Sequence, residues 1–169
     1  MTGGVTVRQA QVSDAGIIQE MLEEAAHWVD ALGVVMWDEG ELAAGRVAGE
    51  IAAGLFFVGE IGGEPAGTLR FQIDDRIFWP DLNGDDSAFI HRLVVRRRYR
   101  GLGVSTALME WAVSRARAMG KRYLRLDCDA SRAKLRRLYE GFGFVFHSFR
   151  QVGAYYVARY EYSLTQDGR

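Results

Sequence analysis

Hydrophobic and polar residues alternate along the chain in patterns that predict seven strands and four helices. The first strand is expected at residues 5–9, where apolar and polar positions alternate. The first helix is expected at residues 15–30, where Ile18, Met21 and Leu22 recur at helical spacing. The other strands are expected at residues 55–61, 66–73, 89–95, 123–128, 144–150 and 155–164, and the other helices at residues 41–53, 103–119 and 132–141.

The order of these elements predicts the fold class. A turn at Gly62-Gly63 joins two strands directly and indicates an antiparallel hairpin, whereas the helix at 103–119 indicates a crossover between parallel strands. We therefore expect an α+β fold with a mixed central sheet of about seven strands flanked by four helices. We expect a single domain over residues 1–169, with residues 1–4 and 165–169 frayed.

A basic, glycine-containing loop lies between the strand at 89–95 and the helix at 103–119. The backbone N–H groups at a helix start lack partners within the helix, and they carry the positive end of the helix dipole. Gly101 and Gly103 allow the backbone to approach a phosphate closely, and four arginines between residues 96 and 100 add positive charge. The loop is therefore predicted to hold a pyrophosphate.

The loop sequence indicates which class of phosphate-binding loop this is. A Gly-x-x-x-x-Gly-Lys-Ser/Thr run is absent, and so is the third glycine of a dinucleotide fingerprint. The end of the strand, Leu93-Val-Val95, and the loop after it instead resemble motif A of the GNAT superfamily of acetyl-CoA-dependent N-acetyltransferases. The signature of this motif is Gln/Arg-x-x-Gly-x-Gly/Ala. The signature fits residues 98–103 or residues 100–105, and we prefer the second because Leu108-Met109 then falls at the apolar pair of the family's helix.

A second stretch, residues 126–144, resembles motif B of the same superfamily, Asn-x-x-Ala/Leu-x-x-Leu/Tyr-Tyr-x-x-x-Gly-Phe. Tyr139 matches the motif's tyrosine, while Arg132 stands where the family has asparagine. Ser131 is the expected N-cap of the helix in this stretch. Together the two motifs extend the resemblance over residues 89–146.

The resemblance implies transfer of an acetyl group from acetyl-CoA to an amine by direct attack in a ternary complex. In such folds the strand at 89–95 splays from the strand at 123–128, which opens a cofactor cleft with a free backbone N–H for the thioester carbonyl. Tyr139 would protonate the leaving thiolate. The implied cofactor contacts are Leu93, Val94, Val95, Arg98, Arg100, Gly101, Leu102, Gly103, Val104, Ser105 and Arg132.

The sequence also suggests candidates for the general base and for the acceptor pocket. An alkyl ammonium with a pKa of ~10 must lose a proton before it attacks, and His91, which regular strand alternation would place on the face of Leu93, suits that role. A structural histidine fits the sequence equally well. Asp75 could bind the amine, and Trp37 and Trp79 could line a pocket or contact a cation, or simply pack over the core.

Charge is distributed unevenly along the chain. Residues 1–90 carry sixteen Asp or Glu and four Arg, and residues 91–169 carry seventeen Lys or Arg and six Asp or Glu, so the formal charges are −12 and +11. Two solvated faces that neutralise each other would explain this pattern. We favour a basic half for a polyphosphate cofactor and an acidic half for a cationic acceptor.

The composition argues against several other classes. The single cysteine excludes an intrachain disulfide framework, and no Cys or His cluster suggests a metal. No apolar run approaches the ~20 residues of a membrane span, and the N-terminus lacks a signal-peptide pattern. We expect a cytoplasmic monomer or homodimer without metal, membrane or nucleic-acid partners.

These observations favour an acetyltransferase that acts on a primary amine of a small, cationic molecule. The second choice of acceptor is a protein N-terminus or lysine. A non-catalytic protein that binds acyl-CoA or a polyanion such as nucleic acid is the alternative from another class, because the arginines could contact phosphates in general.

Overall fold

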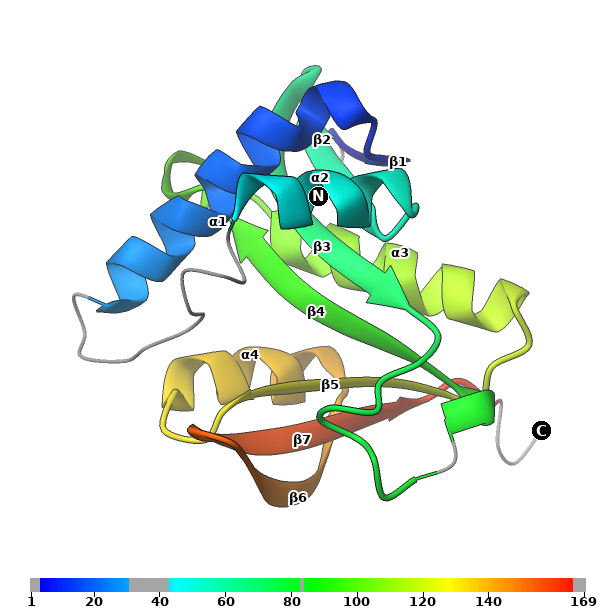
Figure 1. Cartoon of the computed structure of the whole chain (residues 1–169). Helices are drawn as coiled ribbons and strands as arrows, with labels where there is room; N and C mark the ends of the chain where they lie inside the picture. The colour runs from blue at the N-terminus through cyan, green and yellow to red at the C-terminus, as the bar shows by residue number, and fades with distance from the viewer. Residues whose placement is uncertain (1–3, 31–42, 83, 166–169) are drawn as a thin grey trace. The chain divides into compact units, whose positions relative to one another are not determined.

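The computed structural model describes residues 4–30, 43–82 and 84–165 (Figure 1). Its strands are β1 (Val5–Gln9), β2 (Phe56–Ile61), β3 (Glu64–Gln72), β4 (Ser87–Val95), β5 (Tyr123–Asp129), β6 (Val145–Val152) and β7 (Tyr155–Ser163). Its helices are α1 (Ala15–Asp30), α2 (Ala44–Ala52), α3 (Val104–Ala118) and α4 (Ala133–Phe142). Most predicted boundaries are confirmed within two residues; the predicted start of the second helix, residue 41, lies outside the described residues.

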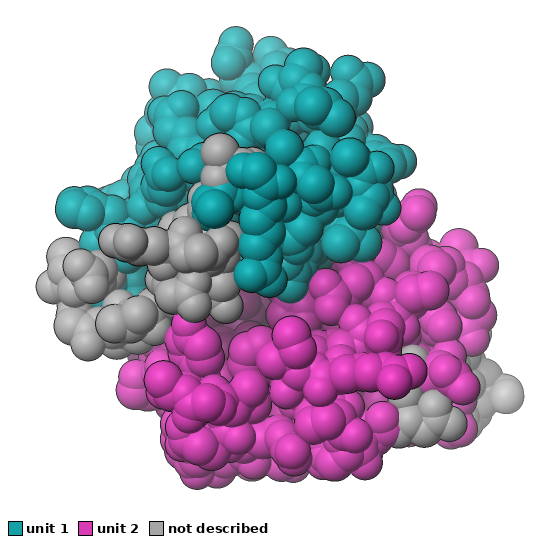
Figure 2. Space-filling model, viewed as in Figure 1, with its two compact units in different colours: residues 1–70, 92–111 teal, residues 71–91, 112–169 magenta. Residues whose placement is uncertain are grey.

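The described strands form one seven-stranded sheet in the order β1-β2-β3-β4-β5-β7-β6. β4 and β5 run parallel, whereas the pairs β1–β2, β2–β3, β5–β7 and β6–β7 are antiparallel. The predicted α+β class with a mixed sheet is therefore confirmed. The chain forms two compact units, residues 1–70 with 92–111 (the first unit) and residues 71–91 with 112–169 (the second unit), coloured separately in Figure 2.

In the first unit, β2 is buried on both faces because helices cover both sides of it. Phe56 and Val58, on one face, join a core with α1 and α2. Phe57 points to the other face, where its ring centroid lies 4.1 Å from that of Trp111 in α3. The strand therefore starts with three consecutive apolar residues, Phe56 to Val58, rather than with alternating apolar and polar ones. The core under α1 and α2 consists of Ala10, Ile18, Met21, Leu22, Val47, Ile51, Phe56, Val58 and Val94.

Gly67 in β3 lets the first turn of α3 lie close to the strand. A Cβ atom at this position would lie 2.8 Å from the carbonyl oxygen of Val94 and 2.9 Å from Cγ1 of Val104. Both separations are too short for a carbon atom, so the position requires glycine. The absence of a side chain at Gly67 thus allows the first residue of α3 to pack against the strand.

In the second unit, β7 separates α4 from the loop that joins β3 to β4. Tyr160 faces α4, where its ring centroid lies 6.2 Å from that of Tyr139. Its neighbour Arg159 holds the loop, because its guanidinium donates to both carboxylate oxygens of Asp81, at 2.7 and 3.1 Å, and to the carbonyl of Phe78 at 3.1 Å. These hydrogen bonds lower the pKa of Asp81 to about 2. The loop is therefore tied to the sheet near its middle.

Candidate active site

β4 carries an irregularity next to His91. Arg92 has a φ of 57°, the left-handed region that a residue with a long side chain rarely adopts. This conformation is an irregularity within the strand, and the expectation that His91 and Leu93 share a face stays a prediction. Backbone strain of this kind often accompanies functional sites, which makes the residues beside Arg92 candidates for one.

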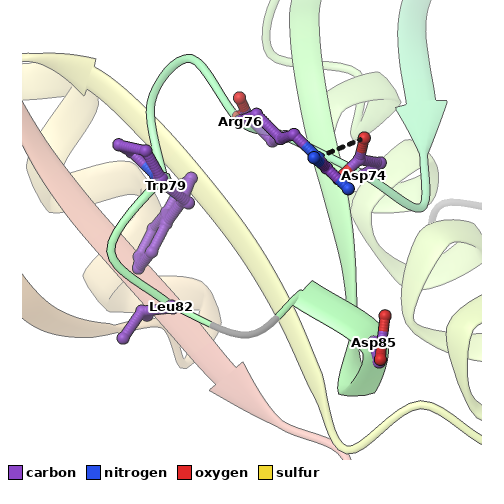
Figure 3. Close-up of a pocket in the computed structure, with 7 residues that line it drawn as sticks. Asp74, Arg76, Trp79, Leu82 and Asp85 are labelled. Carbon is purple, nitrogen blue, oxygen red and sulfur yellow. Dashed lines mark ion pairs between the residues drawn. The ribbon is translucent and has the colours of Figure 1, made fainter.

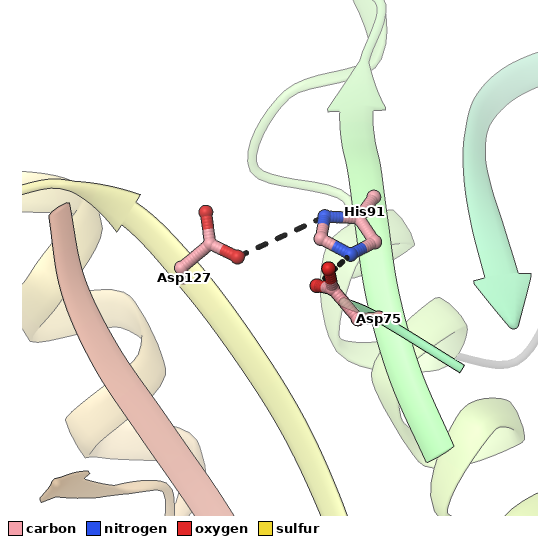
Figure 4. A group of neighbouring side chains, drawn as sticks. All are labelled: Asp75, His91 and Asp127. Carbon is pink, nitrogen blue, oxygen red and sulfur yellow. Dashed lines mark hydrogen bonds and ion pairs between the residues drawn. The ribbon is translucent and has the colours of Figure 1, made fainter. Parts of the chain in front are cut away.

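The His91 ring lies between two carboxylates that come from different elements (Figure 4). Its Nε2 is 2.8 Å from Oδ2 of Asp75, in the segment that follows β3, and its Nδ1 is 3.8 Å from Oδ2 of Asp127 in β5. The three side chains are 11%, 3% and 9% exposed. Each ring nitrogen therefore faces one buried acidic group.

Asp75 is held rigidly, and it is ionised. Its Oδ1 accepts the backbone N–H groups of Ile77, at 3.1 Å, and Phe78, at 2.9 Å, which leaves Oδ2 directed at His91. Burial acts to raise the pKa of Asp75, but the hydrogen bond and charge of His91 and the two N–H bonds together lower it below the usual carboxyl value. Asp75 is thus a carboxylate that accepts hydrogen bonds on both oxygens.

A pocket of about 290 Å³ opens in the loop between β3 and β4 (Figure 3). Three of its lining residues are acidic, Asp74, Asp75 and Asp85, and one is basic, Arg76, whose Nε lies 3.5 Å from Oδ2 of Asp74. Trp79, Pro80 and Leu82 complete the lining. Two of the three predicted acceptor residues, Asp75 and Trp79, thus line one pocket, while Trp37 lies outside the described residues.

Trp79 forms part of the pocket wall but not an open cation box. Its side chain is only 2% exposed. The guanidinium carbons of Arg159 and Arg125 lie 4.5 and 5.3 Å from the ring centroid, so cations of the protein itself already contact the ring. Within the described chain, its buried Nε1 has no hydrogen-bond partner. Packing over the core, one of the two alternatives left open by the sequence, therefore describes this side chain.

Tyr139 lies in α4 with its ring packed against Phe144 and Tyr160, at centroid distances of 6.0 and 6.2 Å. Burial raises the pKa of Tyr139 well above its usual value, and the neighbouring Cys128 adds to this. Its hydroxyl makes no hydrogen bond to any residue that the structure describes. The phenol thus stays protonated at any ordinary pH and keeps its proton available for donation.

Cys128, at the end of β5, is buried and forms no disulfide. Burial, followed by the charge of Asp127, raises the pKa of its thiol to about 12. A thiol that remains protonated is a poor nucleophile. The Cys128 thiol is therefore not a candidate nucleophile.

The basic loop has the backbone geometry that an anion site needs. Gly101 and Gly103 have φ values of 78° and 83°, a conformation that only glycine adopts without strain. α3 starts directly afterwards, and the N–H of Ala107 donates to the carbonyl of Gly103 at 3.0 Å. The N–H groups before Ala107, including those of Val104 and Ser105, have no intrahelical acceptor. This backbone geometry suits an anion, and phosphate binding by these residues stays a prediction.

The arginines of the loop divide into two pairs. Arg96 is bound to the first unit by Glu20, at 2.8 Å, and the guanidinium carbon of Arg97 lies 4.7 Å from the ring centroid of Trp28. Arg98 and Arg100 are exposed, and neither makes an ion pair with an acidic residue in 4–30, 43–82 or 84–165. The guanidinium carbon of Arg98 lies 4.9 Å from the ring centroid of Tyr99, and contacts of Arg98 and Arg100 with the cofactor stay predictions.

Arg132 occupies the N-cap position of α4, without a side-chain cap hydrogen bond. The predicted cap Ser131 is one residue too early, because its hydroxyl and its N–H both donate to the Asp129 carboxylate. That carboxylate thereby forms a turn before the helix. Arg132 is partly exposed, and a cofactor contact by its side chain stays a prediction.

Comparison with known proteins identifies the chain. The sequence model of the acetyltransferase (GNAT) family matches residues 20–144. The chain belongs to this family. The uncharacterized N-acetyltransferase YesJ of Bacillus subtilis (strain 168) is 30% identical over 145 residues, which cover 81% of this chain and 79% of YesJ.

Solved structures of acetyltransferases share the fold. A GNAT acetyltransferase from Listeria monocytogenes 4b F2365 has a TM-score of 0.77 at 23% identity, with 94% of each chain covered. The N-acetyltransferase PaiA from Thermoplasma acidophilum, in complex with coenzyme A, has a TM-score of 0.74 at 16% identity, with 94% of this chain and 99% of PaiA covered. yncA from Salmonella typhimurium, with its cofactor acetyl-CoA, has a TM-score of 0.73 at 18% identity, with 98% of this chain and 96% of yncA covered.

Membership of the GNAT family makes this chain an acyltransferase that uses acetyl-CoA as its co-substrate. The glycine loop and the start of α3 fit that co-substrate, because they provide unpaired N–H groups and cations for its phosphates. Among the described helices, none combines the length and the apolar character that a membrane crossing requires.

The His91 cluster contains atom types that also occur in metal sites, and its three candidate ligand atoms lie within 4.8 Å of one another. GNAT enzymes transfer acetyl groups without a metal. The 2.8 Å separation of His91 Nε2 from Asp75 Oδ2 is that of a hydrogen bond. We therefore interpret these residues as a hydrogen-bonded cluster that can accept and stabilise a proton.

Sequence reasoning missed Asp127. It selected His91 and Asp75 separately, for different roles, and the structure joins them through a hydrogen bond. Asp127 lies in β5, whose sequence Tyr-Leu-Arg-Leu-Asp-Cys-Asp alternates apolar and polar residues, so an aspartate at this position is an ordinary strand pattern. Its contact with His91, which depends on the fold, is what distinguishes it.

Proposed function

We propose that this GNAT enzyme acetylates a primary amine of a small, positively charged molecule. The acidic pocket is the main support, because Asp74, Asp75 and Asp85 line it against a single arginine. Its volume of about 290 Å³ suits a small molecule. Asp75 also belongs to the His91 cluster, so the pocket and the cluster share one residue.

His91 acts as the general base in this proposal. At pH 7 only about one in a thousand alkyl amines with a pKa of ~10 is neutral and able to attack. A positioned base that removes the ammonium proton contributes about 100- to 10,000-fold to the rate. The hydrogen bond that His91 donates to Asp75 fixes the ring, as the hydrogen bond to the third group of a catalytic triad does.

Tyr139 acts as the general acid. The co-substrate supplies the acetyl group as a thioester, held by the main chain of Leu93–Val95, by the loop from Arg98 to Ser105, and by Arg132. As the new C–N bond forms and the C–S bond breaks, Tyr139 donates its hydroxyl proton to the thiolate and later recovers one from water. The nitrogen loses one proton to His91 and a second to water, so each turnover releases one net proton.

The proposal predicts that the pocket carboxylates lower the KM of the amine. In the double variant Asp74→Asn/Asp85→Asn, we expect the KM of a short aliphatic diamine to rise about 10-fold at low salt, since two charges near a cation are lost in a solvated pocket. The KM of acetyl-CoA should stay the same. Thiol release from acetyl-CoA measures both constants.

A matched control separates local from general charge effects. Glu64, the first residue of β3, is exposed, and Glu64→Gln removes one negative charge from a residue that does not line the pocket. This variant should leave both KM values unchanged. An unaltered KM for the diamine in the double variant would mean that the acceptor binds elsewhere.

A further inference from the structure

We propose that Nδ1 of His91 is the atom that accepts the proton, and that Asp127 stabilises the protonated ring as a second carboxylate. This inference rests on the proposed function, since it assigns the atoms of the base step. The three residues come from separate segments, so their arrangement is a product of the fold rather than of a local motif.

The hydrogen bonds of Asp75 determine which nitrogen is available. Its Oδ1 already accepts two backbone N–H groups, and its Oδ2 lies 2.8 Å from Nε2 of His91. A carboxylate only accepts hydrogen bonds, so Nε2 must be the donor. In the neutral ring the lone pair is then on Nδ1, and Nδ1 is the side that faces Asp127.

Asp127 lies where it can stabilise the His91 ring after Nδ1 has accepted a proton. Its Oδ2 lies 3.8 Å from Nδ1, beyond a good hydrogen bond but within ion-pair distance. A proton taken from the substrate ammonium by Nδ1 gives the ring a positive charge between two carboxylates. Since Asp127 is 9% exposed, water screens this attraction little. Asp127 is therefore a positioning residue that acts through His91.

Two arginines lie near the cluster, one next to His91 in the chain and one opposite Asp127 in the sheet. Arg92 follows His91 in β4, and Arg159 pairs with Asp127 in the register between β5 and β7. The Arg159 guanidinium is directed at Asp81, to which it donates two hydrogen bonds. Phe78, whose ring centroid is 5.9 Å from that of His91, covers the ring with an apolar group. Asp75 and Asp127 thus supply the negative charge.

Two substitutions of equal size test the assignment, because they act on opposite nitrogens. Asp75→Asn should lower kcat about 100-fold: its amide oxygen must keep the two backbone N–H bonds, so its NH₂ group faces Nε2 and forces the ring proton onto Nδ1. Asp127→Asn leaves the tautomer intact. It should lower kcat only about 3- to 10-fold and move the acidic limb of the pH–rate profile down by about one unit.

Nitrogen-15 NMR of the three histidines gives a readout that does not depend on activity. Above the acidic limb, His91 should show a protonated Nε2 and an unprotonated Nδ1 in the wild type and in Asp127→Asn, and the reverse in Asp75→Asn. A wild-type ring with its proton on Nδ1, or an unshifted pH profile in Asp127→Asn, would overturn the inference. If the wild type fails to acetylate small amines at all, the proposed function fails instead.

Discussion

Replacing His91 with alanine is expected to lower kcat/KM for the amine about 1,000-fold at pH 7, because the substrate ammonium loses its proton acceptor. The difference in kcat/KM between the wild type and the variant should become smaller as the pH rises towards ~10, because the amine itself is then increasingly neutral. The acidic limb of the profile should follow the amine alone in this variant. Initial rates of thiol release between pH 6 and pH 10, with the wild type in parallel, measure both effects.

Folding and cofactor binding must be unchanged for this comparison. Calorimetric titration of acetyl-CoA into the variant should give the wild-type affinity, and His91→Gln provides a second variant with a hydrogen-bonding side chain. His27 in α1 is exposed, so His27→Ala is the matched control and should keep full activity. If His91→Ala retains the wild-type rate and pH profile, His91 is a structural histidine, and the base must be sought elsewhere.

Replacing Tyr139 with phenylalanine is expected to lower kcat about 100-fold while the KM of acetyl-CoA stays nearly constant. The phenol pKa is raised by burial, so the hydroxyl remains protonated throughout the pH range of the assay. The deficit should therefore be the same from pH 6 to pH 9, in contrast to His91→Ala. Because the hydroxyl has no hydrogen-bond partner among the described residues, its removal should cost little stability.

The leaving group offers a sharper test of Tyr139. An acetyl donor whose leaving group has a low pKa needs no proton at departure, so Tyr139→Phe should use such a donor almost as well as the wild type does. Tyr156 in β7 is 49% exposed, and Tyr156→Phe is the matched control that should keep normal kcat with acetyl-CoA. An equal kcat for wild type and Tyr139→Phe with acetyl-CoA would remove Tyr139 from the mechanism.

The fold was largely predictable because its elements depend on local patterns. β1 and α1 have the predicted boundaries, since hydrophobic spacing and a polar flank define each of them. Ser131 was assigned as a cap from residue type, but the Asp129 carboxylate competes for its hydroxyl. The conformation of Arg92 was also beyond the sequence, because arginine has no preference for positive φ.

The candidate site was only partly predictable, because it depends on contacts between distant segments. His91, Asp75 and Tyr139 could be selected by residue type and resemblance. The pairing of His91 with Asp75 and Asp127 depends on how β4, β5 and the loop before β4 come together. The sequence placed Trp79 in a polar loop, yet the bonds of Arg159 draw this loop onto the sheet and bury the ring.

The most direct test of the central claim is thiol release from acetyl-CoA by the wild type with three acceptors. These are a short aliphatic diamine, an amine of equal length with a carboxylate in place of the second amine, and a peptide with a free N-terminus and a lysine. We predict that kcat/KM for the diamine exceeds that for the carboxylated amine at least 10-fold at low salt, since the pocket is acidic. Preference for the peptide, or equal rates with the two small amines, would contradict the proposed acceptor.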